Sequence, residues 1–398
     1  MKTLFMGEQS TLPVVLRHLL KLRHGQLIFK GVWNGAVGEN SDLQAVIQVH
    51  DARLMELLFR NGVLGAAEGF IRGYWNSEDL VDVIRILARN RDVLDRMNQN
   101  AVAKASQLLL KAWYKSRKNS IDGSRKNIAE HYDLSNDFFK LFLDSSMMYS
   151  SAVFKEPGMS LEQASDYKKE LICQKLKLKP MDHLVEIGSG WGGFAIYAAQ
   201  QYGCKVTTIT ISKAQYDEAV ARVAAAGLSH RVTVQLKDYR LLEGKYDKLV
   251  SIEMIEAVGE QYLPTYFRKC RELLKPNGLA LIQAITIEDA RYAKALNTVD
   301  YIKRYIFPGS FIPCISVMTQ TASEQKLRLK HLEDIGQSYA QTLHCWRQRF
   351  LQQHDQVLGL GFDERFIRMW DFYLCYCEGG FREGVISDVH LLFEASAY

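Results

Sequence analysis

The chain has 398 residues, which is enough for two or three domains of ordinary size. Its composition, with 47% hydrophobic residues, 24% charged residues and seven prolines, excludes a disordered, low-complexity or collagen-like protein. The 50 basic and 45 acidic residues give a formal net charge of +5, which is too small to indicate nucleic-acid binding but suits an anionic membrane surface.

The cysteines and the N-terminal residues exclude two further classes of protein. The seven cysteines are scattered and form no CxxC pair, so we expect neither a disulfide framework nor a metal site. Glu8, Arg17 and Lys21 interrupt the apolar residues near the N-terminus, which is not the pattern of a secretory signal. No window has the roughly 18 apolar residues that a membrane span needs. The sequence therefore predicts a cytoplasmic protein that contacts a membrane without crossing it.

The first 118 residues predict a smaller α+β domain. Residues 26–33 and 43–50 have the pattern of strands, and the Asn34–Gly35 turn between them predicts a hairpin. Residues 51–58 and 81–88 have apolar residues at helical spacing. The domain is weakly similar to lipid-carrier modules and shows no cluster of catalytic residue types.

A basic segment ends this domain. Residues 101–126 include seven Lys or Arg residues and one acid, Asp122, together with Trp113 and Tyr114. Two interpretations stay open. The segment is either a solvated connector between domains or a basic helix that contacts anionic lipid headgroups, since aromatic residues beside Lys and Arg suit a membrane interface.

Residues 119–398 have the pattern of a doubly wound, Rossmann-like α/β domain. Short apolar runs alternate with helical stretches, as they do when helices cover both faces of a parallel sheet. Five runs predict parallel strands, and two later runs predict an antiparallel pair that completes a seven-stranded sheet. The seven runs are residues 184–187, 205–209, 232–236, 248–254, 279–285, 326–332 and 387–394.

A glycine-rich loop follows the first of these strands. Gly188, Gly190 and Gly193 satisfy GxGxxG, which alone is weak evidence for a dinucleotide. Residues 207–212, where a dinucleotide fold has an acid for the ribose, contain no carboxylate. Glu186, two residues before the first glycine, instead favours S-adenosylmethionine as the cofactor. Two residues stand just after the third strand, where such folds usually hold the adenine: Asp238 and Tyr239.

Seven motifs resemble one family, the cyclopropane-fatty-acyl-phospholipid synthases and related mycolic-acid methyltransferases. They occur in the family's order over residues 125–394, which makes the set more specific than any single motif. The resemblance implies a class I methyltransferase fold. The motifs are residues 131–139 (HYDLSNDFF), 148–152 (MYSSA), the glycine loop, 210–215 (TISKAQ), 251–256 (SIEMIE), 305–309 (YIFPG) and 339–343 (YAQTL).

The resemblance implies which residues contact S-adenosylmethionine. The TISKAQ segment takes the place of the missing ribose acid, and the cofactor lies over the glycine loop. The implied contacts are Tyr149, Ser150, Gly188, Gly190, Trp191, Thr210, Ile211, Gln215 and Asp238.

The resemblance also implies the reaction. The family adds the methyl group of S-adenosylmethionine to a cis double bond in a phospholipid acyl chain, and the resulting carbocation loses a proton to close a cyclopropane ring. A cation in an apolar site needs aromatic faces and a nearby base. The candidate aromatic residues are Tyr132, Tyr149, Phe307 and Tyr339.

In this family the base is a bound bicarbonate, and the sequence keeps part of its binding set. Glu256, Ile285 and Tyr339 match, whereas Ser151 stands in place of a cysteine and Gln283 in place of a histidine. Serine and glutamine are neutral donors that can still hold an anion, but the titratable imidazole is lost. These two departures leave bicarbonate binding open.

Three outcomes therefore stay open for the function: a cyclopropane product, a methylene- or methyl-branched product of the same family, and a lipid-binding homologue without catalysis. The implied partner is a phospholipid bilayer with unsaturated acyl chains, contacted from its inner face. Family resemblance also suggests a homodimer.

Overall fold

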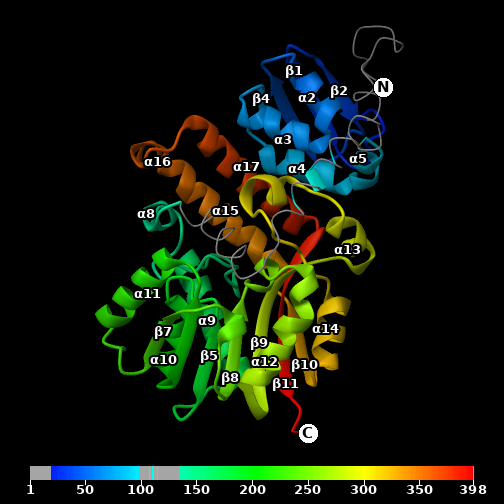
Figure 1. The fold of residues 1–398 in the computed structure, drawn as a ribbon. Helices are drawn as coiled ribbons and strands as arrows, with labels where there is room; N and C mark the ends of the chain where they lie inside the picture. Colours follow the sequence, from blue (N-terminus) through cyan, green and yellow to red (C-terminus); the bar gives the residue numbers. More distant parts are fainter. Residues whose placement is uncertain (1–18, 98–106, 108–109, 112–113, 115–133, 398) are drawn as a thin grey trace. The chain divides into compact units, whose positions relative to one another are not determined.

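The computed structural model describes residues 19–97, 107, 110–111, 114 and 134–397 (Figure 1). The chain divides into two compact units. Unit 1 contains the described residues up to 114 together with 297–306 and 351–385, two segments that the sequence pattern placed in the second domain. Unit 2 contains the other described residues, 134–296, 307–350 and 386–397. The predicted boundary at residue 118 and most of the predicted basic helix lie outside the described residues.

Unit 1 contains a four-stranded sheet in the order β2-β1-β3-β4. The strands β1 (Gln26–Gly31) and β3 (Gln44–Val49) correspond to the two predicted strands, but they pair in parallel, so the predicted hairpin between them is wrong. The turn leads instead into β2 (Gly35–Gly38), which is antiparallel to β1. This return strand of four small residues has no alternating hydrophobic pattern that sequence analysis can detect. β4 (Trp75–Asn76) pairs with β3.

The helices of unit 1 come from both ends of the chain. The two predicted helices are confirmed as α2 (Leu54–Asn61) and α4 (Leu80–Arg89). Between them the glycine-bearing stretch forms α3 (Val63–Ile71), where Gly65 permits close packing because a Cβ atom there would lie 2.0 Å from the Leu57 carbonyl oxygen. The other helices are α5 (Arg91–Met97), a short π-helix (Ile302–Ile306), α16 (His354–Gly359) and α17 (Glu364–Arg382).

Helix α17 is anchored to the N-terminal part of unit 1 by backbone acceptors and an ion pair. The Arg368 guanidinium donates to the carbonyl oxygens of Phe70, at 2.5 Å, and Trp75, at 2.7 Å. Glu383, which follows the helix, accepts from Arg85 and Arg89, each at 2.7 Å. These contacts make α17 part of unit 1 although it is distant in sequence.

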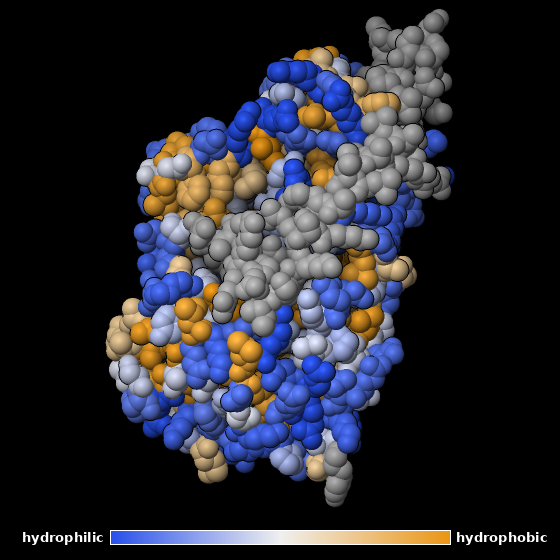
Figure 2. Space-filling view, in the orientation of Figure 1, coloured by the Kyte–Doolittle hydropathy of each residue, from blue (hydrophilic) through white to orange (hydrophobic). Residues whose placement is uncertain are grey.

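Hydrophobic side chains reach the surface around α16 and the loop that follows it (Figure 2). Leu358 is 37% exposed and Leu360 is 40% exposed. Within the described part of the chain, no helix is both long enough and apolar enough to span a bilayer.

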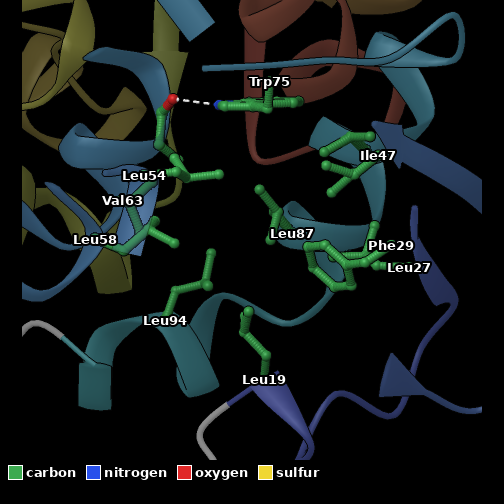
Figure 3. Close-up of a pocket in the computed structure, with 12 residues that line it drawn as sticks. Leu19, Leu27, Phe29, Ile47, Leu54, Leu58, Val63, Trp75, Leu87 and Leu94 are labelled. Carbon is green, nitrogen blue, oxygen red and sulfur yellow. Dashed lines mark hydrogen bonds between the residues drawn. The ribbon is translucent and has the colours of Figure 1, made fainter. Parts of the chain in front are cut away.

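An apolar cavity of about 60 Å³ lies inside unit 1 (Figure 3). The indole N–H of Trp75, one of the lining residues, already donates to the Ala66 carbonyl oxygen at 2.8 Å. The cavity therefore offers space for an apolar group but no catalytic side chain. Its lining residues are Leu19, Leu27, Phe29, Ile47, Leu54, Leu58, Val63, Ala66, Trp75, Val83, Leu87 and Leu94.

Unit 2 contains the predicted seven-stranded sheet, in the order β10-β11-β9-β8-β5-β6-β7. Its fold class is confirmed, including the antiparallel pair at one end; β11 is antiparallel to both of its neighbours, β9 and β10. The strands are β5 (His183–Ile187), β6 (Lys205–Thr210), β7 (Val232–Leu236), β8 (Tyr246–Ile252), β9 (Leu274–Ile287), β10 (Leu327–Asp334) and β11 (Ile386–Ala395).

Helices cover both faces of this sheet (Figure 1), because alternate strand residues point to opposite sides. Leu184 of β5 packs with α9, α10 and α11 on one face, whereas the next residue, Val185, packs with α12 and α14 on the other. The helices of the two layers are α9 (Leu161–Leu176), α10 (Gly193–Tyr202) and α11 (Lys213–Ala225), then α12 (Leu263–Leu273) and α14 (Ile315–Glu324). The remaining helices are α8 (Asn136–Lys140), α13 (Asp289–Leu296) and α15 (Gly336–Gln352).

The strand order indicates where on the sheet a ligand binds. From β5 the chain adds β6 and β7 on one side, then crosses to add β8 and β9 on the other. Ligands of such sheets bind beyond the carboxyl ends of the strands at this switch point. The site is therefore expected after β5 and β8, where the glycine loop and residues 251–256 begin.

Candidate active site

The glycine loop is fixed to the end of β6 and leaves open space above it. The backbone N–H groups of Gly188 and Ser189 both donate to the Ile209 carbonyl oxygen, at 3.1 and 2.8 Å. Gly190 has a φ of 48°, and no atom lies within 4 Å of where its Cβ would be. A ligand can therefore approach the backbone of this loop closely.

The end of the loop is braced by segments from earlier in the chain. At Gly193 a Cβ atom would lie 2.3 Å from the Ser146 carbonyl oxygen. Trp191 is 1% exposed, and its indole N–H donates to Asn136 Oδ1 of α8 at 2.8 Å. The Trp191 ring also lies 4.9 Å from that of Phe139, centroid to centroid. These contacts hold the loop in one conformation before any ligand binds.

Neutral polar groups follow β6, where a dinucleotide-binding fold would have an acid. The Thr210 hydroxyl donates to Gln215 Oε1 at 2.8 Å and accepts from the Ser212 N–H at 3.1 Å. Ser212 in turn caps α11 by accepting from the Gln215 N–H. Ile211 lies between them, partly exposed. This arrangement suits a ribose or adenosine edge better than a phosphate, because it carries no positive charge.

The two residues predicted after β7 differ in their surroundings. Asp238 is buried, and Arg240 donates to its two carboxylate oxygens at 2.8 and 2.6 Å. The Tyr239 ring packs 5.7 Å from that of Tyr266 within the core. Asp238 thus stands at the edge of the site as an ion-paired acid, while the Tyr239 side chain belongs to the core under it.

Glu186, which the sequence associated with the cofactor, is buried at the end of β5. The Thr208 hydroxyl donates to its carboxylate at 2.5 Å, and burial raises the pKa of Glu186 to about 8. The open glycine loop, the uncharged end of β6 and this acid together fit S-adenosylmethionine. The chain residues that would hold it are those predicted around these three strand ends.

A carboxylate that the sequence analysis missed lies at the centre of the predicted catalytic set. Glu253, just after β8, accepts from the Ser151 backbone N–H at 2.7 Å, from Gln283 Nε2 at 2.8 Å and from the Tyr339 hydroxyl at 2.6 Å. Its φ of 46° is uncommon for a residue with a side chain. The signal was an acid at the carboxyl end of a central strand, but the family motif directed attention to Glu256 three residues later.

The orientation of the Gln283 side chain is set by a buried network. Its amide nitrogen donates to Asp388 Oδ2 at 2.7 Å as well as to Glu253, and its oxygen lies 3.2 Å from His390 Nε2. His390 Nδ1 lies 2.7 Å from Lys175 Nζ, and burial with this cation keeps the pKa of His390 well below its ordinary value. A neutral His390 that accepts from Lys175 therefore donates to Gln283, which aims both amide hydrogens at carboxylates.

A buried lysine balances these acids. Lys168 of α9 is fully buried, and its ammonium donates to the Ser150 hydroxyl at 2.6 Å. Burial lowers the pKa of Lys168 to about 8, while the charges of Glu253 and Asp388 oppose that shift. Sequence reasoning did not identify this residue, because a lysine in an amphipathic helix is ordinarily solvated.

Two predicted catalytic residues pair with each other beside Glu253. The Ile285 N–H donates to Glu256 Oε1 at 2.6 Å, and the buried Glu256 Oε2 has no hydrogen-bond partner among the described residues. Burial and the neighbouring charge of Glu253 raise the pKa of Glu256 to about 8. Glu256 thus keeps a proton at neutral pH more readily than an ordinary glutamate.

Aromatic rings line the same region. The Trp346 ring lies 5.4 Å from the Tyr149 ring and 6.1 Å from the Tyr339 ring, and Phe307 lies 6.5 Å from Tyr149. The predicted aromatic residue Tyr132 lies outside the described residues. Ser151 contributes only its backbone N–H to Glu253, because the Ser151 hydroxyl donates to the Ala152 carbonyl oxygen.

Comparison with known proteins agrees with this geometry. The sequence profile of the mycolic acid cyclopropane synthetase family matches residues 119–391. The chain belongs to this family. The resemblance drawn from the seven motifs is confirmed, and the protein is an S-adenosylmethionine-dependent methyltransferase.

Two curated members of the family are similar over most of their length. The tuberculostearic acid methyltransferase UfaA1 of Mycobacterium tuberculosis is 39% identical over 82% of this chain and 78% of its own. The cyclopropane-fatty-acyl-phospholipid synthase of Escherichia coli is 33% identical over 86% of each chain. The solved mycolic acid cyclopropane synthase CmaA1, complexed with SAH and CTAB, is 29% identical with a TM-score of 0.64 over 68% of this chain and 98% of its own.

We predict that Gly193→Ala weakens S-adenosylmethionine binding at least tenfold, about 1.4 kcal/mol. The added Cβ would force the glycine loop away from the Ser146 carbonyl oxygen. Isothermal titration calorimetry measures the effect. Gly359→Ala is the matched control, because its Cβ would meet no atom within 4 Å and its φ is ordinary. Equal affinities for the two variants would contradict the assigned role of the loop.

A second prediction follows from the raised pKa of Glu256. At pH values between 4.5, the ordinary pKa of glutamate, and about 8, Glu256 is ionised in the unfolded chain but keeps its proton in the folded protein. Rising pH therefore lowers the unfolding free energy of the wild type across this range. Glu256→Gln does not titrate. Its unfolding free energy relative to the wild type should therefore rise by about 3–4 kcal/mol between pH 5 and 8, since each pH unit contributes about 1.4 kcal/mol.

Urea unfolding at several pH values tests this expectation. The exposed Glu156→Gln is the control and should show no such trend. A difference between Glu256→Gln and the wild type that stays constant with pH would show that Glu256 is ionised in the folded protein throughout this range.

Proposed function

We propose that the protein adds a methyl group from S-adenosylmethionine to a cis double bond in the acyl chain of a phospholipid, and that proton loss from the added methyl closes a cyclopropane ring. The observation that carries this proposal is the Glu253 carboxylate, which accepts a hydrogen bond from Tyr339, a member of an aromatic cluster with Trp346 and Tyr149. A carboxylate and aromatic faces are what a carbocation needs in a site shielded from water.

The relative from Escherichia coli supports this substrate and product. Its name states that it is a cyclopropane-fatty-acyl-phospholipid synthase, and it aligns with 86% of this chain, including unit 1 residues. The cofactor supplies an electrophilic methyl group, and the aromatic rings stabilise the charge that appears on the acyl chain. Lys168 and the surrounding donors keep the acids of the site in place while that charge develops.

A branched acyl chain is the second candidate product. UfaA1, the relative at 39% identity, is named a tuberculostearic acid methyltransferase, which favours this outcome. The carbocation would then lose a proton from a chain carbon rather than from the added methyl. Both products contain one additional CH₂, so only their structures distinguish them.

We also propose that the protein acts at the inner face of a phospholipid membrane. Two features support it: the basic residues between 101 and 126, and the exposed Leu358 and Leu360 beside α16. Basic residues attract anionic headgroups, and exposed apolar side chains enter the interface. A homodimer stays a prediction from family resemblance.

Gas chromatography with mass spectrometry tests the reaction. Purified protein, S-adenosylmethionine and vesicles of a cis-monounsaturated phospholipid should yield cyclopropane fatty acids after transesterification. Saturated phospholipid vesicles are the control and should yield none. A methylene- or methyl-branched product would support the second candidate, and no product from any unsaturated phospholipid would contradict both.

Vesicle sedimentation tests the membrane proposal. Replacing Lys111, Lys115, Arg117 and Lys118 with Gln should weaken binding to anionic vesicles by about 1 kcal/mol per basic residue near the surface. A Leu358→Ser and Leu360→Ser variant should weaken binding to both anionic and neutral vesicles. Unchanged partitioning of both variants would exclude these four basic residues and these two leucines from membrane contact.

A further inference from the structure

We propose that Glu253 is the built-in base of the reaction and takes the place that the family gives to bicarbonate. This inference rests on the proposed function, since it names the group that receives the proton from the carbocation. It would make turnover independent of bicarbonate and give the departure at Gln283 a role, because the Gln283 amide donates to Glu253.

The position of the Glu253 carboxylate is the main evidence. Family resemblance assigned Ser151, Gln283 and Tyr339 to the anion, and each of them donates a hydrogen bond to Glu253 within 2.8 Å. A carboxylate and a bicarbonate share a planar O–C–O group with one negative charge. The side chain therefore presents the same acceptor to the same donors without a bound ion.

The donor hydrogens leave no capacity for a second anion at this place. The Ser151 N–H and the Tyr339 hydroxyl have one hydrogen each, and both point to Glu253. Gln283 uses one amide hydrogen for Glu253 and the other for Asp388. Bicarbonate would have to break these bonds and enter beside the Glu253 carboxylate and the buried Asp388 carboxyl group. The residues present do not fit it.

The protein holds Glu253 in a conformation that ordinary packing would not produce. Its φ of 46° lies in the left-handed region, which residues with a side chain uncommonly adopt. Strained backbone of this kind persists where the surroundings impose it, as at functional sites. Burial raises the pKa of Glu253 overall, and the nearby charge of Lys168 counters part of that shift by favouring the ionised form. The three donors likewise favour the ionised form.

Glu256, the acid expected from the motif, is less suited to this role. It accepts one hydrogen bond, from the Ile285 N–H, and the charge of Glu253 favours its protonated form. Of two neighbouring carboxyl groups, the one with more donors ionises first. Glu253 is therefore the base, and Glu256 is the protonated neighbour.

The alkene, the methyl donor and Glu253 together account for every bond and proton of the reaction. The alkene π electrons form a bond to the methyl carbon, the carbon–sulfur bond breaks with its electrons on sulfur, and a cation remains on the second alkene carbon. Glu253 then removes a proton from the added methyl. The electrons of that C–H bond form the third side of the ring, and the protonated Glu253 later releases its proton to water.

The test compares three proteins in buffer freed of carbon dioxide and in the same buffer with added bicarbonate. Glu253→Gly suits its φ and removes the carboxylate while leaving the donors facing a space. Glu253→Gln keeps the volume and removes the base. Glu156→Gly, at an exposed loop position, is the control. Product formation, S-adenosylmethionine affinity and thermal unfolding are measured for each.

We expect wild-type turnover to change less than twofold with bicarbonate. Both Glu253 variants should lose at least about 100-fold in turnover, the range of general-base catalysis, while their cofactor affinity stays near that of the wild type. Their unfolding temperatures should fall, because buried donors lose an acceptor, but both variants should stay folded at the assay temperature. Bicarbonate should restore Glu253→Gly at least tenfold but not Glu253→Gln, whose side chain still fills the space.

Several outcomes would overturn the assignment. These are a wild type that requires bicarbonate, a Glu253→Gln variant that keeps its turnover, a Glu253→Gly variant that bicarbonate does not restore, or equal losses of turnover and cofactor affinity. A wild type that forms no product from any unsaturated phospholipid would overturn the proposed function itself, and this result is distinct from the other four.

Discussion

The site depends on one carboxyl group, that of Glu253, and on the donors that bond to it. The Glu253 carboxylate joins three segments that are distant in sequence: the loop at Ser151, strand β9 at Gln283 and helix α15 at Tyr339. Burying a charge without partners would cost several kcal/mol. The same interactions that stabilise the charge therefore fix the relative positions of a loop, a strand and a helix around the reacting groups.

Much of unit 2 could be predicted from sequence because its signals are local. Buried parallel strands appear as short apolar runs, and a turn that must approach a ligand appears as glycine, as at Gly190. The seven strands with their antiparallel last pair, the glycine loop and the polar cluster at Thr210 followed from such patterns. The parallel pairing of β1 with β3 did not, since the short strand between them lacks an alternating pattern.

The catalytic centre was predictable as a set of residues but not as a geometry. The motifs identified Ser151, Gln283 and Tyr339, yet hydrogen-bond direction depends on tertiary contacts that one sequence does not contain. The importance of Glu253 and Lys168 became visible only through their partners. The departures at Ser151 and Gln283 left bicarbonate binding open in the sequence. In the structure the Gln283 amide, the Ser151 backbone N–H and the Tyr339 hydroxyl all donate to one acceptor, Glu253.

The division of the chain into units has a consequence for how this protein can be dissected. Unit 1 takes segments 297–306 and 351–385 from within the stretch that matches the family profile. A fragment beginning at residue 119 would thus retain α17 but lose the backbone carbonyls that Arg368 binds and the arginines that pair with Glu383. Because the units are interleaved along the chain, exchange of one unit between relatives requires several junctions.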